Sequence, residues 1–267
     1  MCGICGYVGL KHPAAPILRE MLVTMEKYRL GYESAGIATL HKGKISCVKD
    51  VGSVEKVFLE GGTWSESLLG SIGIGHVRYP SPKAPTGKKM FAHPFQSCDG
   101  KIALVHNGTI YNYKEIMPEL RGHTFSSLDK KSNSLNDSEI IVHLLEEEIK
   151  KTEGNLTEAV KRTCQRLSTN SKNQFLFAFI HTSEPARIHV VSGKDFEDKR
   201  KVAIAFKERF GSIFASYRDT GIENLKPIKF EALRSFVNPK LDRAEVLDYD
   251  TMAVLTSESY QLIPLTK

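Results

Sequence analysis

The feature that most constrains the fold of this chain is a long succession of short β segments. Segments rich in Val and Ile alternate with turns that contain Gly, Asn or Lys-Gly, a pattern typical of strands joined by hairpins. The predicted strands are Ile4–Leu10, Gly36–His41, Lys44–Val51, Ser71–Tyr79, Lys101–Ile110, Phe175–His181, Arg187–Gly193, Lys201–Phe206, Ser212–Tyr217, Ala244–Asp250, Thr251–Thr256 and Tyr260–Leu265. Strands that follow each other so closely favour antiparallel sheets.

Four segments have the apolar spacing of amphipathic helices. The first covers about Ala15–Tyr28, and the others begin at Asn112, Asn136 and Asn155, each with Glu three residues later as in a capping box. Many strands with a few helices indicate an α+β fold with antiparallel sheets. The central strands are apolar on both faces, so two stacked sheets between two helical layers would bury them.

Composition narrows the class of protein. A chain of 267 residues fits a single domain, here 1–267, and its net charge of +6 comes without a basic stripe interleaved with aromatic residues. We therefore expect no nucleic-acid partner. No apolar run approaches the length of about 20 residues that spans a membrane, and no signal peptide is present. The five cysteines are widely spaced, so we expect a cytoplasmic protein with reduced thiols and without metal or cofactor.

The chain opens with MCGICGYVGL, which places Cys2 directly after Met1. Removal of Met1 would leave a thiol and a free α-amino group on one residue, and an α-amine with a pKa of roughly 7.7–8.0 can act as a base near neutral pH. Two other interpretations stay open. Cys2 and Cys5 form a C-x-x-C pair that could bind zinc or cycle as a disulfide, or both could be buried strand residues.

Three other places carry side chains suited to one substrate. Arg78 ends a strand and offers a planar fork for a carboxylate, and Asp137 offers an anion for an ammonium group. Asn107 beside Gly108 offers an amide and a backbone N–H for a developing oxyanion. Together with Cys2, these groups could hold an α-amino acid at one end and attack its side-chain carbonyl at the other. Glutamine is such a molecule.

The order of the motifs adds a family resemblance. The sequence contains MCGICGYVG, YRLGYESAG, GIGHVRYPS, FAHPF, VHNGTIYNY and DSEII, in that order. In this it resembles the class II glutamine amidotransferase domain, an N-terminal-nucleophile (Ntn) hydrolase, in particular the glutaminase domains of glucosamine-6-phosphate synthase and amidophosphoribosyltransferase. The resemblance covers roughly the first 190 residues.

The resemblance implies a four-layer αββα sandwich and hydrolysis of glutamine to glutamate and ammonia. It also implies a role for each matching residue. The catalytic residues would be Cys2 as nucleophile with Asn107 and Gly108 as oxyanion hole, and the substrate-binding residues would be Arg78, Asp137, Ser81 and His93.

Three departures from the family pattern matter. Leu30 is inserted into the Y-R-G-Y motif, and Tyr79 replaces a frequent Trp. We expect no synthase domain to follow, and we expect residues 195–267 to complete the sheets and add a divergent extension. The ammonia would then go to a separate synthase subunit, docked near the loop Pro80–Lys89. The alternatives are an amidohydrolase of another γ-glutamyl compound and a non-catalytic regulatory subunit of this fold.

Overall fold

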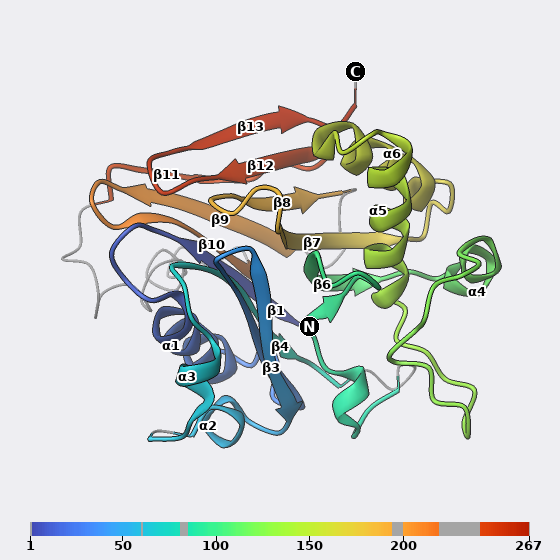
Figure 1. Cartoon of the computed structure of the whole chain (residues 1–267), viewed down its shortest axis with the longest axis horizontal. Coiled ribbons are helices and arrows are strands. Elements are labelled where there is room, and N and C mark those ends of the chain that lie inside the picture. The colour runs from blue at the N-terminus through green and yellow to red at the C-terminus, as the bar shows by residue number, and fades with distance from the viewer. Residues whose placement is uncertain (1, 60, 81–84, 194–199, 219–240, 267) are drawn as a thin grey trace.

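Two antiparallel β-sheets form the centre of the protein (Figure 1). The structure is a computed structural model, and it describes residues 2–59, 61–80, 85–193, 200–218 and 241–266. The first sheet has seven strands in the order β11-β9-β10-β1-β4-β2-β3, and the second has six in the order β13-β12-β8-β7-β6-β5. The strands are β1 (Gly3–Val8), β2 (Ser34–His41), β3 (Lys44–Val51), β4 (Ile72–Arg78), β5 (Phe95–Gln96), β6 (Ile102–Thr109), β7 (Gln174–His181), β8 (Ile188–Ser192), β9 (Arg200–Lys207), β10 (Gly211–Arg218), β11 (Arg243–Val246), β12 (Thr251–Leu255) and β13 (Tyr260–Pro264).

Helices cover the outer faces of both sheets. Figure 1 shows α1, α2 and α3 beside the first sheet and α5 and α6 beside the second. The helices are α1 (Ala14–Lys27), α2 (Val54–Val57), α3 (Trp64–Ser67), α4 (Tyr113–Ile116), α5 (Glu139–Lys151) and α6 (Leu156–Ser168), with short 3₁₀ turns at η1 (Lys89–Phe91) and η2 (Met117–Glu119).

Three apolar clusters hold the four layers together. One lies between the sheets and includes Ile4, Ile74 and Val105. The second packs α5 and α6 on the strands β6 and β7, and the third packs α1 on the outer face of the first sheet. Because central strands are buried on both faces, each sheet needs a cover on either side. The predicted four-layer αββα sandwich is confirmed.

The N-termini of the helices test the predicted capping residues. Asn155 caps α6 as predicted, since its side chain accepts a hydrogen bond from the backbone N–H of Glu158. The helix predicted to start near Asn136 begins as α5 at Glu139, and the Asn136 side chain accepts a hydrogen bond of 3.0 Å from the backbone N–H of Ser138 in the turn before it. The predicted helix from Asn112 is a single turn, and the Asn112 side chain forms no cap.

Two further expectations concern the ends of the chain and the membrane. The strands β9, β10 and β11 join the first sheet and β12 and β13 join the second, while residues 194–199 and 219–240 lie outside the described residues. That 1–267 forms one domain with a divergent extension stays a prediction. Within the described parts of the chain, every helix is too short or too polar to cross a bilayer.

Candidate active site

Cys2 lies where the first sheet ends. Cys2 directly precedes β1, which pairs antiparallel with β4 so that Gly3 lies opposite Val77. Cys2 therefore lies beside the end of β4, whose last residue is Arg78. The backbone N–H of Tyr79 donates to Cys2 Sγ at 3.5 Å. The thiol is partly exposed, as an attacking group must be.

Cys5 lies within β1, whereas Cys2 precedes this strand and has its Sγ near the backbone of Tyr79. Cys5 is fully buried against α1, and burial raises the pKa of its thiol. All five cysteines are free. A C-x-x-C disulfide or shared metal site is therefore wrong, and the prediction that Cys5 is a core residue is confirmed.

The second sheet brings Asn107 and Gly108 toward this end. Both lie on β6, which contacts β1 and β4 across the inter-sheet core, and His76 Nε2 on β4 lies 3.1 Å from the carbonyl oxygen of His106. Asn107 is buried. Gly108 has no room for a side chain, because an added Cβ would lie 2.0 Å from the Gln174 carbonyl oxygen. The two residues predicted to form the oxyanion hole thus lie near the end of β6.

Asp137 is tied to the same strand. It precedes α5, and its Oδ2 accepts a hydrogen bond of 2.6 Å from the backbone N–H of Ile110, just after β6. Burial raises the pKa of the Asp137 carboxyl to about 6, although the positive charge of Arg78 opposes the shift. The carboxyl is therefore costly to ionise until a cation joins it.

Arg78 already has partners. Its Nη1 donates to Glu33 Oε2 at 3.1 Å and its Nη2 donates to the Pro85 carbonyl oxygen at 2.7 Å. The other carboxylate oxygen of Glu33 accepts from the backbone N–H of Gly87 at 2.8 Å. Sequence reasoning missed Glu33, and its signal was the acidic residue inside YRLGYESAG. Arg78 and Glu33 together bind the backbone of Pro85 and Gly87.

Ser81 and His93 have different outcomes. Ser81 lies outside the described residues. The ring of His93 is buried and stacks on His76 with centroids 4.0 Å apart, and its edge faces Phe95 at 4.7 Å. Burial lowers the pKa of both histidines, for His76 to about 3, so both rings are neutral. A substrate-binding role for His93 stays a prediction.

The departures from the family pattern are accommodated locally. Arg29 takes a left-handed backbone conformation with φ of 59°, and Leu30 turns into the cluster under α1. Tyr79 is 41% exposed and packs edge-on against Tyr32, which is 54% exposed, with ring centroids 5.7 Å apart. The insertion therefore leaves the strand pairing intact, and Tyr79, whose backbone contacts Cys2, pairs its exposed ring with Tyr32.

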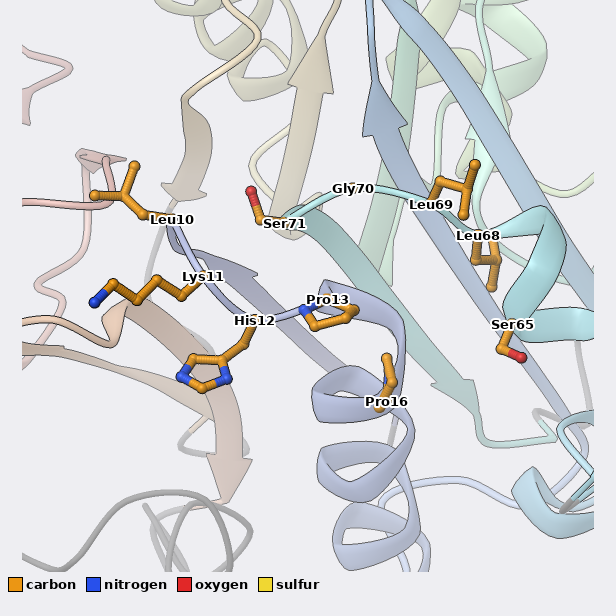
Figure 2. A pocket seen from close by; sticks show the side chains of 10 residues that line it. All are labelled: Leu10, Lys11, His12, Pro13, Pro16, Ser65, Leu68, Leu69, Gly70 and Ser71. Carbon is orange, nitrogen blue, oxygen red and sulfur yellow. The ribbon is translucent and has the colours of Figure 1, made fainter.

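A separate hollow of about 400 Å³ lies far along β1 from this site. Figure 2 shows it between the turn Leu10–Pro13, the start of α1 and the segment Leu68–Ser71. Cys2 precedes the first residue of β1, whereas this hollow follows its last residue. The hollow does not belong to the candidate active site.

Known proteins match both the sequence and the fold. A family model for the glutamine amidotransferase domain matches residues 60–160. Glutamine–fructose-6-phosphate aminotransferase (isomerizing) of Pyrococcus horikoshii is 38% identical over 197 residues, which cover 71% of this chain and 29% of that protein. The protein of the same name from Sulfurisphaera tokodaii is 41% identical over 154 residues, 57% of this chain and 24% of the relative.

The chain carries a class II glutamine amidotransferase domain. Its fold is also that of the glutamine phosphoribosylpyrophosphate amidotransferase of B. subtilis, with a TM-score of 0.67 and 21% identity, over 99% of this chain and 49% of that one. A glutamine aminotransferase class-II domain protein from Silicibacter pomeroyi matches over the full length of both chains, with a TM-score of 0.61 and 13% identity. The chain spans under a third of the curated relatives named above.

Proposed function

We propose that this amidotransferase domain hydrolyses the side-chain amide of glutamine to glutamate and ammonia, with Cys2 as the nucleophile. The observation that carries the proposal is the contact between Cys2 Sγ and the backbone of Tyr79. It puts the thiol next to Arg78, at the end of the sandwich where β6 presents Asn107 and Asp137 is anchored. The proposal requires removal of Met1.

The chemistry follows from these positions. The α-amino group of Cys2 takes the thiol proton, and the thiolate attacks the amide carbon of glutamine. The oxygen of the tetrahedral intermediate takes up negative charge, which the Asn107 amide and the Gly108 N–H stabilise. The leaving nitrogen receives the proton and departs as ammonia. Water then hydrolyses the γ-glutamyl thioester and frees Cys2.

The other end of glutamine binds through charge. We propose that its ammonium group meets the Asp137 carboxylate and that its carboxylate replaces the Pro85 carbonyl at Arg78 Nη2. A guanidinium fork binds a carboxylate better than a single carbonyl. Ser81 would line the substrate loop. His93 would support that loop indirectly, through the stacking of its ring on His76.

The test is to incubate the protein with glutamine and measure glutamate and ammonia, with the intact mass recorded on the same sample. A diazoketone analogue of glutamine should form one adduct, located on Cys2 and absent from Cys98, the most exposed of the other cysteines. Full activity in protein that keeps Met1 would contradict the self-base mechanism. Preference for another γ-glutamyl compound in competition would favour the amidohydrolase alternative, and a pure sample without turnover would favour the regulatory subunit.

We further propose a separate synthase subunit that takes the ammonia. The aminotransferase names of the relatives support an ammonia acceptor, because they join glutamine to the amination of a sugar phosphate. The exposed rings of Tyr32 and Tyr79 beside Cys2 offer a surface suited to a protein contact. The rate of glutamine hydrolysis should rise when the partner and its substrate are added. A high rate that is insensitive to candidate partners would contradict a separate synthase subunit.

The mechanism needs a reduced Cys2 thiol, which also supports a cytoplasmic location.

A further inference from the structure

Four side chains from three separate segments converge beside α5, away from Cys2. Cys98 lies between β5 and β6, His123 lies after η2, and His143 and Glu146 lie one turn apart on α5. Each offers one ligand atom, and these four atoms all lie within 4.8 Å of one another. From this arrangement we propose that Cys98, His123, His143 and Glu146 bind a zinc ion.

Five of the six distances between the ligand atoms are close to the edges of a tetrahedron around zinc. Cys98 Sγ lies 3.5 Å from His123 Nδ1 and 3.7 Å from His143 Nδ1. The two Nδ1 atoms are 3.2 Å apart, and Glu146 Oε2 lies 3.3 Å from the first and 3.5 Å from the second. With Zn–N and Zn–O of about 2.0–2.2 Å and Zn–S of about 2.3 Å, the edges of a tetrahedron are about 3.3–3.6 Å long.

Each histidine has a carboxylate on the far side of its ring, hydrogen-bonded to His123 and farther away from His143. His123 Nε2 lies 3.0 Å from Glu147 Oε1, and His143 Nε2 lies 3.7 Å from Glu139 Oε1. A carboxylate behind the ring favours the proton on Nε2 and leaves the Nδ1 lone pair facing inward, as in carboxylate–histidine–zinc arrangements. The backbone N–H of Thr124 donates to Cys98 Sγ at 3.4 Å, a contact suited to a thiolate.

A cation explains this cluster better than hydrogen bonds alone. With both rings protonated at Nε2, the two Nδ1 lone pairs would oppose each other at 3.2 Å. Backbone N–H groups of Thr124 and Cys98 donate to Cys98 Sγ and Glu146 Oε2, so the two Nδ1 atoms are the ones that most need a cation. The side chains of both histidines and of Glu146 are at most 5% exposed, whereas Cys98 is exposed. A divalent cation at the centre would satisfy all four atoms at once.

The types of ligand favour zinc over other divalent ions, and their number favours a structural role over a catalytic one. Imidazole and thiolate ligands disfavour magnesium and calcium, and four protein ligands fill the tetrahedron that zinc prefers, with no position left for substrate. A cavity of about 600 Å³ lined in part by Cys98, Thr124 and Ser126 gives access for the ion. This proposal departs from the expectation of no metal and does not depend on glutamine hydrolysis.

The ion would fasten two loops to the helix that Asp137 precedes. The loop of His123 continues into Ser126 and Ser127, which donate to the Glu139 carboxylate at the start of α5. We therefore name Cys98, His123, His143 and Glu146 the zinc cluster, and we expect it to hold this part of the substrate site in place.

The test measures metal in the full chain, prepared without an affinity tag, loaded with zinc and desalted. Inductively coupled plasma mass spectrometry should find about one zinc per chain. Cys98→Ser should lower this at least tenfold, whereas the matched control Cys47→Ser should keep it. Protein without stoichiometric zinc, or Cys98→Ser that keeps it, overturns the proposal.

A second measurement covers the case in which Cys98→Ser does not fold. Wild-type protein loaded with cobalt(II) should show the intense visible bands of a tetrahedral site and a thiolate-to-cobalt charge-transfer band. Weak octahedral bands without charge transfer would overturn the proposal. Because neither measurement uses glutamine, failure here is distinct from failure of the proposed function.

Discussion

The two cysteine sites of this domain differ in how far apart their polar groups stand. Around Cys2, the groups come from the ends of β4 and β6 and from Asp137, two residues before α5, and we propose that they hold a substrate molecule between them. In the zinc cluster, the four ligand atoms lie within 4.8 Å of one another and leave space for an ion only. Both sites contain a cysteine and a carboxylate, so the distances between the polar groups decide what each site can bind.

The largest expected effect is on glutamine hydrolysis, and it leaves zinc binding unchanged. Cys2→Ala should lower glutamine hydrolysis by about 10³-fold or more, because it removes the group that forms the covalent bond. Its zinc content should equal that of the wild type. Steady-state ammonia release and metal analysis on one sample check both, with Cys5→Ala as the control that keeps most of the activity. Equal losses from both substitutions would contradict the role of Cys2.

The next effect concerns the oxyanion. Asn107→Ala should lower kcat by about 10²–10³-fold with a smaller change in KM, because the side-chain amide acts on charge that develops only in the transition state. Steady-state kinetics with glutamine checks this. A change confined to KM would place Asn107 in ground-state binding instead.

Smaller effects are expected where the substrate is only held. Arg78→Lys and Asp137→Asn should each raise the KM for glutamine about tenfold or more, with kcat less affected, because each weakens one charged contact. Arg78→Lys also tests the loop contact with Pro85. An unchanged KM in either variant would show that the residue does not bind the substrate.

The pH dependence follows from Asp137. Its pKa is raised to about 6, so the KM for glutamine should rise as the pH falls through 6, and Asp137→Asn should remove this part of the profile.

The same carboxyl should make stability depend on pH. The pKa of Asp137 in the folded state lies above the ordinary value of 3.8, so the folded state binds the proton more tightly. The stability contributed by this group is therefore present below about pH 4 and is lost as pH rises through 6. Unfolding curves of both proteins at pH 4 and 7.5 check the sign.

The smallest effect couples the two sites. Cys98→Ser should raise the KM for glutamine a few-fold and leave kcat nearly unchanged, because the zinc cluster touches only the support of Asp137. Added zinc should restore nothing in this variant, whereas it should restore zinc-stripped wild-type protein. A large loss of kcat would instead place the cluster in the chemistry.

The sequence by itself determined the strand-rich α+β class, the cap at Asn155 and the motif set around Cys2, because period-two apolar patterns and short motifs are local signals. It placed the start of α5 three residues too early, and it could not show that the Asn136 amide also donates to the carbonyl of Phe91, a partner 45 residues away.

Only the tertiary structure decided which polar residues meet. Glu33 joins Arg78 across β2 and β4, and Cys98 joins a histidine that lies 45 residues further along the chain. His143 and Glu146, three residues apart on a helix, were a weak signal that became a site only when two loops supplied Cys98 and His123. The physical reason is that a ligand set is defined by distances of a few ångströms, and those are fixed when sheets, helix and loops pack together.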